Sequence, residues 1–164
     1  MNRMELLAHY WECTYDKEDW FPPLKDALAG VTAAQASWRP EGEAANTIWE
    51  NVSHLLYYKE QLLHRLSGTE FIHTAKTNDD TFRPSGGADD EAAWQATLQR
   101  LEAVHQQIQE KLAALSEEQF DQPLANAPVG KRVMSIILHD AFHTGQIVQI
   151  RKLQGSWPAR RSFE

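Results

Sequence analysis

The fold is decided by residues 131–153, which read KRVMSIILHDAFHTGQIVQIRKL. Apolar residues recur there at intervals of three and four, which is typical of an α-helix, and they cover nearly every side of it. A helix that is apolar almost all round is buried in the protein interior. This segment nevertheless carries His139 and His143, one helical turn apart. Two buried histidines need partners, because an unpaired polar nitrogen in the interior costs free energy.

Three further helical tracts are predicted upstream, over residues 4–15, 48–66 and 89–115. The second begins at a capping box, in which the Thr47 hydroxyl and the Glu50 carboxylate each satisfy an exposed backbone amide. Its apolar stripe and that of the third tract recur every three or four residues. The stripe residues are Ile48, Val52, Leu55, Leu56, Leu62, Leu63 and Leu66, then Trp94, Leu98, Leu101, His105, Ile108 and Leu112.

Two polar connections, residues 69–88 and 116–130, separate these tracts, and a short helix is expected over residues 23–28 after the Pro22-Pro23 break. Alternation typical of β-strands is largely absent. Long amphipathic helices must bury their apolar stripes against one another. We therefore predict an all-α protein, an antiparallel four-helix bundle in a single domain over residues 1–164.

Composition narrows the possible partners. The 164 residues carry a net charge of −7 with 42% apolar residues, which is typical of a globular and acidic protein. No basic run is present to bind nucleic-acid phosphates or anionic lipid, so neither partner is expected. Cys13 is the single cysteine, and we find no segment resembling a signal peptide or a membrane span. These observations favour a cytoplasmic protein.

The spacing of His139 and His143 places both imidazoles on one helix face, where they could bind a single ion. They could equally be core histidines bonded to carbonyl groups or water. A third ligand would have to come from another helix. His105 lies on an apolar stripe and is slightly favoured by that pattern. His54 lies on a polar flank with Asn51, Tyr58 and Gln61, which could equally be a solvated face or the lining of a pocket. The residues alone leave the third ligand undecided.

The sequence resembles the DinB/YfiT-like family of metal-dependent enzymes over nearly the whole chain. The family's C-terminal motif is matched by His139, His143 and the following Gly-Gln-Ile at 145–147, and its Asn-x-x-His run by Asn51 and His54. Thr144 departs from the basic residue that many relatives carry there. The wider match includes Trp38-Arg39-Pro40, Ile48-Trp49-Glu50, Glu91-Ala92-Ala93-Trp94 and residues 151–158, RKLQGSWP.

The resemblance implies that His54, His139 and His143 bind one divalent metal ion, and that His105 is a core or pocket residue. It also implies a homodimer. Imidazole ligands suit Zn, Ni, Cu and Fe, of which zinc or nickel is expected. The side chains expected to line the pocket are Asn51, Tyr58, Gln61, His105 and Gln146.

Three neutral imidazoles leave a coordination position free, which is typical of catalytic zinc sites. The expected function is a metal-dependent enzyme that activates water or a low-molecular-weight thiol, of hydrolase or S-transferase type, with a small-molecule substrate. Asp140 and Glu60 are candidate general bases by their position in the sequence. Glu60 is better explained as a solvated helix residue, and Asp140 as a carboxylate that orients an imidazole ligand or as a charge on the helix surface. The alternative is a non-catalytic bundle in which the metal has a structural or oligomerisation role.

Overall fold

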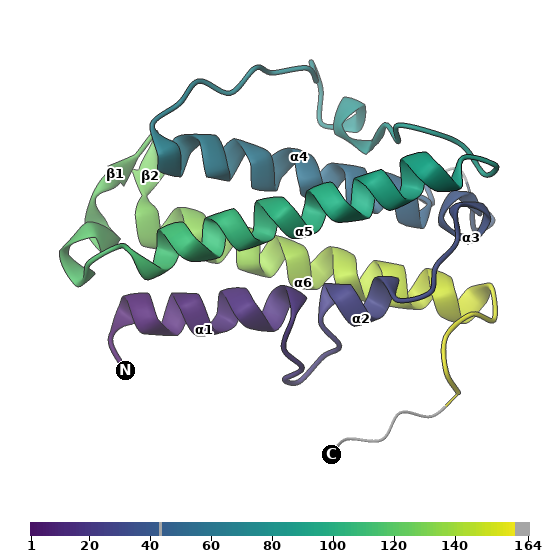
Figure 1. Cartoon of the computed structure of the whole chain (residues 1–164), viewed down its shortest axis with the longest axis horizontal. Helices are drawn as coiled ribbons and strands as arrows, with labels where there is room; N and C mark the ends of the chain where they lie inside the picture. The colour runs from purple at the N-terminus through teal and green to yellow at the C-terminus, as the bar shows by residue number, and fades with distance from the viewer. Residues whose placement is uncertain (43, 160–164) are drawn as a thin grey trace.

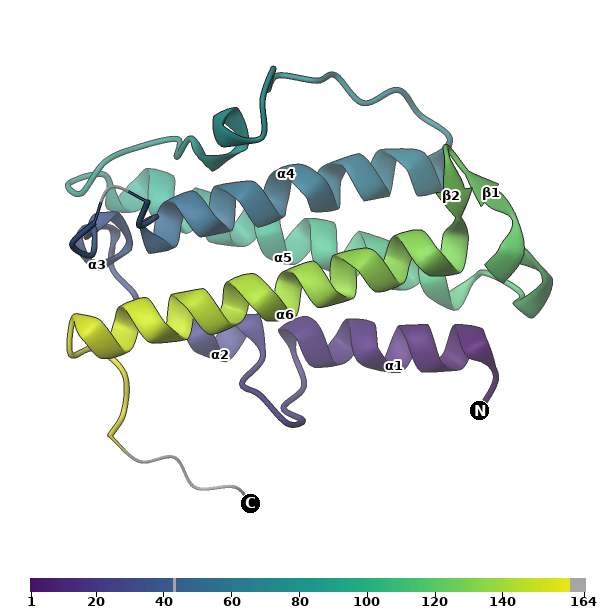
Figure 2. The ribbon, with the colours of Figure 1, turned by 180° about the vertical axis from the view of Figure 1, so that it is seen from behind.

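The computed structural model describes residues 1–42 and 44–159 and is all-α in its main architecture. Four long helices lie side by side: α1 (Arg3–Tyr15), α4 (Ile48–Ser67), α5 (Glu91–Ala113) and α6 (Val129–Leu153) (Figure 1). Helices α4 and α1 each pack against both α5 and α6. From behind, α6 lies between α4 and the lower layer formed by α1 and α2 (Leu24–Leu28) (Figure 2).

The predicted helices agree with the observed ones to within two residues at either end. The capping box at the start of α4 is present, with Thr47 Oγ1 accepting from the Glu50 amide and the Glu50 carboxylate accepting from the Thr47 amide. Gly68 ends the helix in the left-handed conformation, which costs glycine little because it has no Cβ. The short helix expected at residues 23–28 is also observed, as α2.

The connections contain more structure than the sequence patterns predicted. Helix α3 (Ala33–Ser37) has five residues, too few to show a periodicity. A short helix, η1 (Asp79–Phe82), interrupts the first connection and packs on α4. The second connection holds η2 (Glu117–Asp121) and an antiparallel pair of two-residue strands, β1 (Pro123–Leu124) and β2 (Ala127–Pro128).

The core is built around three fully buried tryptophans, which are Trp11, Trp49 and Trp94. Trp49 on α4 and Trp94 on α5 meet edge to face, with ring centroids 5.2 Å apart. Trp94 Nε1 donates to the Val31 carbonyl at 2.6 Å, which ties the segment before α3 to α5. Trp49 and Trp94 therefore serve packing within the chain.

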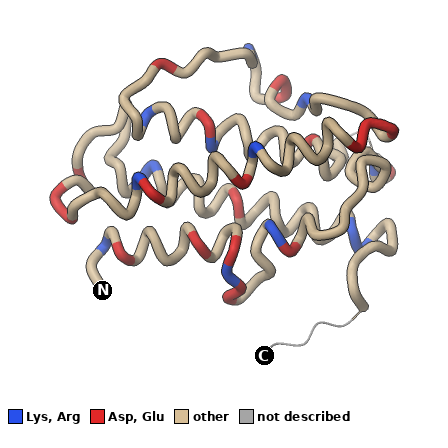
Figure 3. The backbone as a smooth tube through the Cα atoms, in the orientation of Figure 1, with Lys and Arg blue, Asp and Glu red and all other residues tan. Residues whose placement is uncertain are grey.

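The charged residues are distributed over all the long helices, with acidic and basic side chains interspersed along the tube (Figure 3). In the part of the chain that the structure describes, no helix is both long and apolar enough to cross a membrane.

Candidate metal centre

Three histidines from two helices converge beneath η1. His54 comes from α4, and His139 and His143 come from α6. One ring nitrogen from each lies within 4.8 Å of the other two, and the Nε2 atoms of His54 and His139 are 2.8 Å apart. His54 and His143 are buried, with 4% and 6% of their surface exposed. The structure thus brings together the three residues that the resemblance singled out.

The hydrogen bonds of Thr81 determine which nitrogen of His54 carries the proton. Thr81 Oγ1 lies 2.6 Å from His54 Nδ1 and donates its only proton to the Asn78 carbonyl at 2.5 Å. The hydroxyl must therefore accept from His54 Nδ1–H, because a hydroxyl has a single donor. This leaves the lone pair of His54 Nε2 facing the other two histidines.

Asn51 orients His143 in the same way. Its amide nitrogen donates to the Thr47 carbonyl at 2.8 Å, so its oxygen faces His143 Nδ1, also at 2.8 Å. His143 Nδ1 must then donate, and its Nε2 lone pair is free. Bonding the outer nitrogen of a histidine to an oxygen is how proteins hold imidazole ligands of metal ions.

The donor set fits a divalent transition metal. Two of the three imidazoles have a hydrogen-bonded Nδ1 and therefore an unprotonated Nε2, and all three belong to a residue type that binds Zn, Ni, Cu and Fe. Nitrogens bound at about 2.0–2.1 Å to one tetrahedral ion lie about 3.3 Å apart. The Nε2 atoms of His54 and His139 are 2.8 Å apart, so they must move about half an ångström further from each other to bind one ion.

Aromatic side chains enclose the cluster on the side of η1. The Phe82 ring stacks on His54 with centroids 3.9 Å apart and planes at 12°. Tyr58 contacts both His54 and His139 edge to face, at 5.0 and 5.4 Å, while its hydroxyl donates to Asn78 Oδ1. Such walls limit the access of water to the imidazoles.

The other residues expected at the pocket fall into two groups. Asn51, Tyr58 and Gln146 lie at the histidines, where Gln146 acts to raise the pKa of His143. Gln61 is half-buried on α4, and its place in the pocket stays a prediction. His105 is fully buried in the core, where its ring stacks between those of Trp11 and Tyr15.

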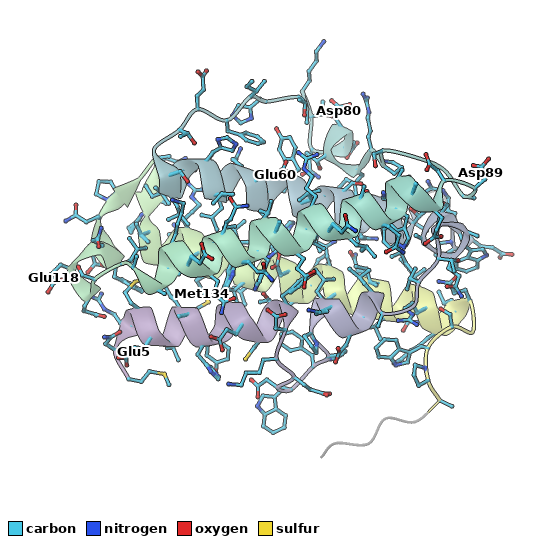
Figure 4. All side chains as sticks on the ribbon, viewed as in Figure 1. Glu5, Glu60, Asp80, Asp89, Glu118 and Met134 are labelled. Atoms are coloured by element: carbon cyan, nitrogen blue, oxygen red, sulfur yellow. The ribbon has the colours of Figure 1, made fainter. Side chains whose placement is uncertain are left out.

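Neither candidate general base is a free carboxylate. Asp140 is fully buried, so it is not a helix-surface charge, and its Oδ2 lies 2.5 Å from Lys59 Nζ. Glu60 pairs with Arg100 of α5 at 2.5 Å, and Figure 4 shows Glu60 on α4 and Asp80 on the overlying η1. Thr81, Phe82 and Lys59 were missed by sequence reasoning. A polar residue interrupting the apolar stripe at position 59 was the only signal for any of them.

Burial makes the cluster resistant to protonation. Burial is the main cause and the neighbouring His139 acts in the same direction, and together they lower the pKa of His54 to about 3 and that of His143 to about 4. Burial also lowers the pKa of His139, with Lys59 acting in the same direction. All three imidazoles are therefore neutral at pH 7, which is the state that binds metal.

We expect the metal-free protein to lose stability as the pH falls from about 6.5 to about 4. In the unfolded chain these histidines titrate near pH 6.5, so the unfolded state binds more protons than the native state over this interval and is favoured by acid. The loss should be about 2 kcal/mol for each of His54 and His143 by about pH 5. Urea unfolding of chelator-treated protein between pH 7 and about pH 4.5 measures it.

Two variants test the origin of this pH dependence. His143→Gln removes one buried imidazole and should make the fall shallower, whereas the exposed His73→Gln should leave it unchanged. A free energy of unfolding that stays constant between pH 7 and about pH 5 would contradict the buried neutral cluster.

The fold and the site together define an all-helical protein with three converging, oriented histidines. The sequence model of the DinB superfamily matches residues 24–147, which include all three. The chain therefore belongs to the DinB superfamily. Searches of curated proteins and of solved structures give no significant match.

Proposed function

We propose that this protein is a metal-dependent enzyme built on an antiparallel four-helix bundle, with residues 1–164 as a single domain. One observation carries the proposal. Over residues 1–42 and 44–159, the candidate metal cluster consists of His54, His139 and His143, without a carboxylate or thiolate. Three protein ligands with a position left for water or substrate are typical of catalytic sites, whereas structural zinc sites have four protein ligands.

Zinc or nickel at this position would keep its full double charge, because all three imidazoles are neutral. Such an ion lowers the pKa of the water or thiol that it binds, which supplies a nucleophile at neutral pH. The protein's own contribution is to fix the Nε2 lone pairs of His54 and His143. Thr81 and Asn51 do this by accepting the Nδ1 protons of His54 and His143.

A groove next to Thr81 supports a small-molecule substrate, although none of the three histidines lines it. It has a volume of about 680 Å³, which suits a metabolite, and lies between α4, α5 and the connection that carries η1. Thr81 lines the groove and also bonds His54, so the groove and the cluster share a wall. Its other polar lining includes Ser53, Thr97 and the Glu60–Arg100 pair.

The test uses cobalt(II), whose visible spectrum reports its ligands. Chelator-treated protein is loaded with one equivalent of cobalt and titrated with 2-mercaptoethanol or cysteine. We expect a new thiolate-to-cobalt charge-transfer band in the near ultraviolet that saturates at one thiol per protein, because the ion has a free position. Turnover is then measured as S-transfer to an electrophile and as ester hydrolysis.

The His139→Ala variant is the matched control, since it removes a ligand and should show neither the band nor turnover. A cobalt spectrum that does not respond to thiol, in a protein without either activity, would favour the alternative of a non-catalytic metal-binding bundle.

The expected homodimer and cytoplasmic location remain predictions. Leu138 and Phe142, each 63% exposed, lie one turn apart on the outer face of α6 and would suit an apolar seam between two copies.

A further inference from the structure

A buried ion pair joins the two helices that carry the candidate ligands. Lys59 Nζ of α4 lies 2.5 Å from Asp140 Oδ2 of α6, with the two side chains 0% and 1% exposed. Lys59 follows His54 by five residues, and Asp140 lies between His139 and His143 in the sequence. The pair therefore lies next to the cluster along both helices.

The Lys59 ammonium is held from the other two long helices as well. It donates to His105 Nδ1 of α5 at 3.2 Å and lies over the Trp11 ring of α1 at 4.2 Å. Trp11 also donates from Nε1 to the His105 carbonyl at 3.2 Å. His105 accepts as a neutral imidazole, because burial and the Lys59 charge lower its pKa to about 2. One polar layer thus connects α1, α4, α5 and α6.

Stability alone does not explain this pair. Removing two charges from water costs so much that apolar residues of similar volume often give an equally or more stable protein. A buried ion pair does provide direction, because it is satisfied in one relative position of its helices, whereas apolar contacts are non-directional. A helix rises 1.5 Å per residue, and metal ligands must be placed to within about 0.2 Å. Register between α4 and α6 therefore matters at this site.

We propose that Lys59 and Asp140 are positioning residues, which set the register of α4 against α6 and so place His54 relative to His139 and His143. The inference rests on the proposed metal site. The pair acts through the helices and has no part in the chemistry. Its net charge is zero whichever atom holds the proton, so its removal leaves the total charge near the site unchanged.

The test replaces both members, as Lys59→Met/Asp140→Leu. We expect the variant to fold with a Tm close to that of the wild type, because the exchange of a buried pair for apolar residues offsets the loss of the hydrogen bond from Lys59 to His105. We also expect the affinity for cobalt(II), measured by competition with a chelator, to fall about 10- to 100-fold, as it does when residues that orient metal ligands are removed. The visible spectrum of the bound cobalt should change in position and intensity.

The matched control is Lys25→Gln/Glu102→Gln, which removes an exposed ion pair between α2 and α5, away from the histidines. It should leave the cobalt affinity and spectrum unchanged. If the apolar variant fails to fold, the test uses Lys59→Gln/Asp140→Asn instead, whose side chains have a similar volume and can form a hydrogen bond. This variant is expected to bind cobalt more weakly than the wild type, with an altered spectrum.

Unchanged affinity and an unchanged spectrum in the folded variant overturn the inference, whatever happens to the Tm, because the pair would then serve stability alone. This failure is distinct from failure of the proposed function. If the wild type itself does not bind cobalt, the metal site is wrong and the register proposal falls with it.

Discussion

Replacing any one of His54, His139 and His143 with alanine is expected to leave a protein that cannot retain its metal against a chelator. Zinc sites with four protein ligands bind with about 10–16 kcal/mol, or about 3 kcal/mol per ligand, so the loss of one should weaken binding roughly 100-fold or more. The three variants should behave alike, although His54 comes from α4 and the others from α6. Elemental analysis after the same dialysis measures the effect.

Two other histidines serve as controls. His64 lies on α4 ten residues after His54 and bonds Thr69, so His64→Ala should retain metal in full. His105→Ala should lose stability, because His105 is fully buried, but should still take up one equivalent at saturating metal. Metal retained by His54→Ala and lost by His105→Ala would show that the ligand set is wrong. Retention by all the variants would exclude a histidine site.

The helices were predictable because their signals are local. Apolar residues at intervals of three and four define α4, α5 and α6, and the Thr47–Glu50 capping box fixes the start of α4. The signal that pairs His139 with His143 is also local, since both residues belong to one buried helix. The packing of η1 on α4 was not predictable, because the polar connection has no apolar periodicity that would indicate which helix it contacts.

The third histidine illustrates the limit of pattern reasoning. His105 lies on an apolar stripe, and that pattern slightly favoured it over His54. Its Nδ1 instead accepts a hydrogen bond from Lys59, and its ring stacks on those of Trp11 and Tyr15. His54 has polar neighbours in the sequence because Asn51 and Tyr58 contact the other histidines, so its polar flank is a buried site rather than a solvated face.

In the sequence, the polar layer appears only as polar residues at positions where apolar residues are expected, and the structure is needed to interpret them. Lys59 interrupts the stripe of α4 between Leu55 and Leu62, at the spacing where another apolar residue is expected. Asp140 and His105 occupy corresponding buried positions on α6 and α5. Each alone suggests a surface residue or a ligand. That they meet one another depends on the packing of separate helices, which no single stripe encodes.

The layer also accounts for the second large effect that we expect, which is the loss of stability when one charge is removed alone. Lys59→Met leaves Asp140 buried without its partner and should lower the free energy of unfolding by about 3–5 kcal/mol at neutral pH. Burial already raises the pKa of Asp140, with Lys59 opposing the shift, so removal of Lys59 raises it further. Urea unfolding of the wild type and the variant at several pH values measures the deficit.

The pH dependence of that deficit identifies its cause. With a raised pKa, Asp140 binds a proton in the native variant that the unfolded chain has already released, so stability relative to the wild type should improve as the pH falls and worsen as it rises. Asp140→Asn should not show this trend, because it has no carboxylate at position 140 that could bind a proton. The double variant Lys59→Met/Asp140→Leu should also lack the trend and show little deficit. If Lys59→Met and Asp140→Asn lose stability equally at every pH, the loss comes from packing, and the buried charge is not its source.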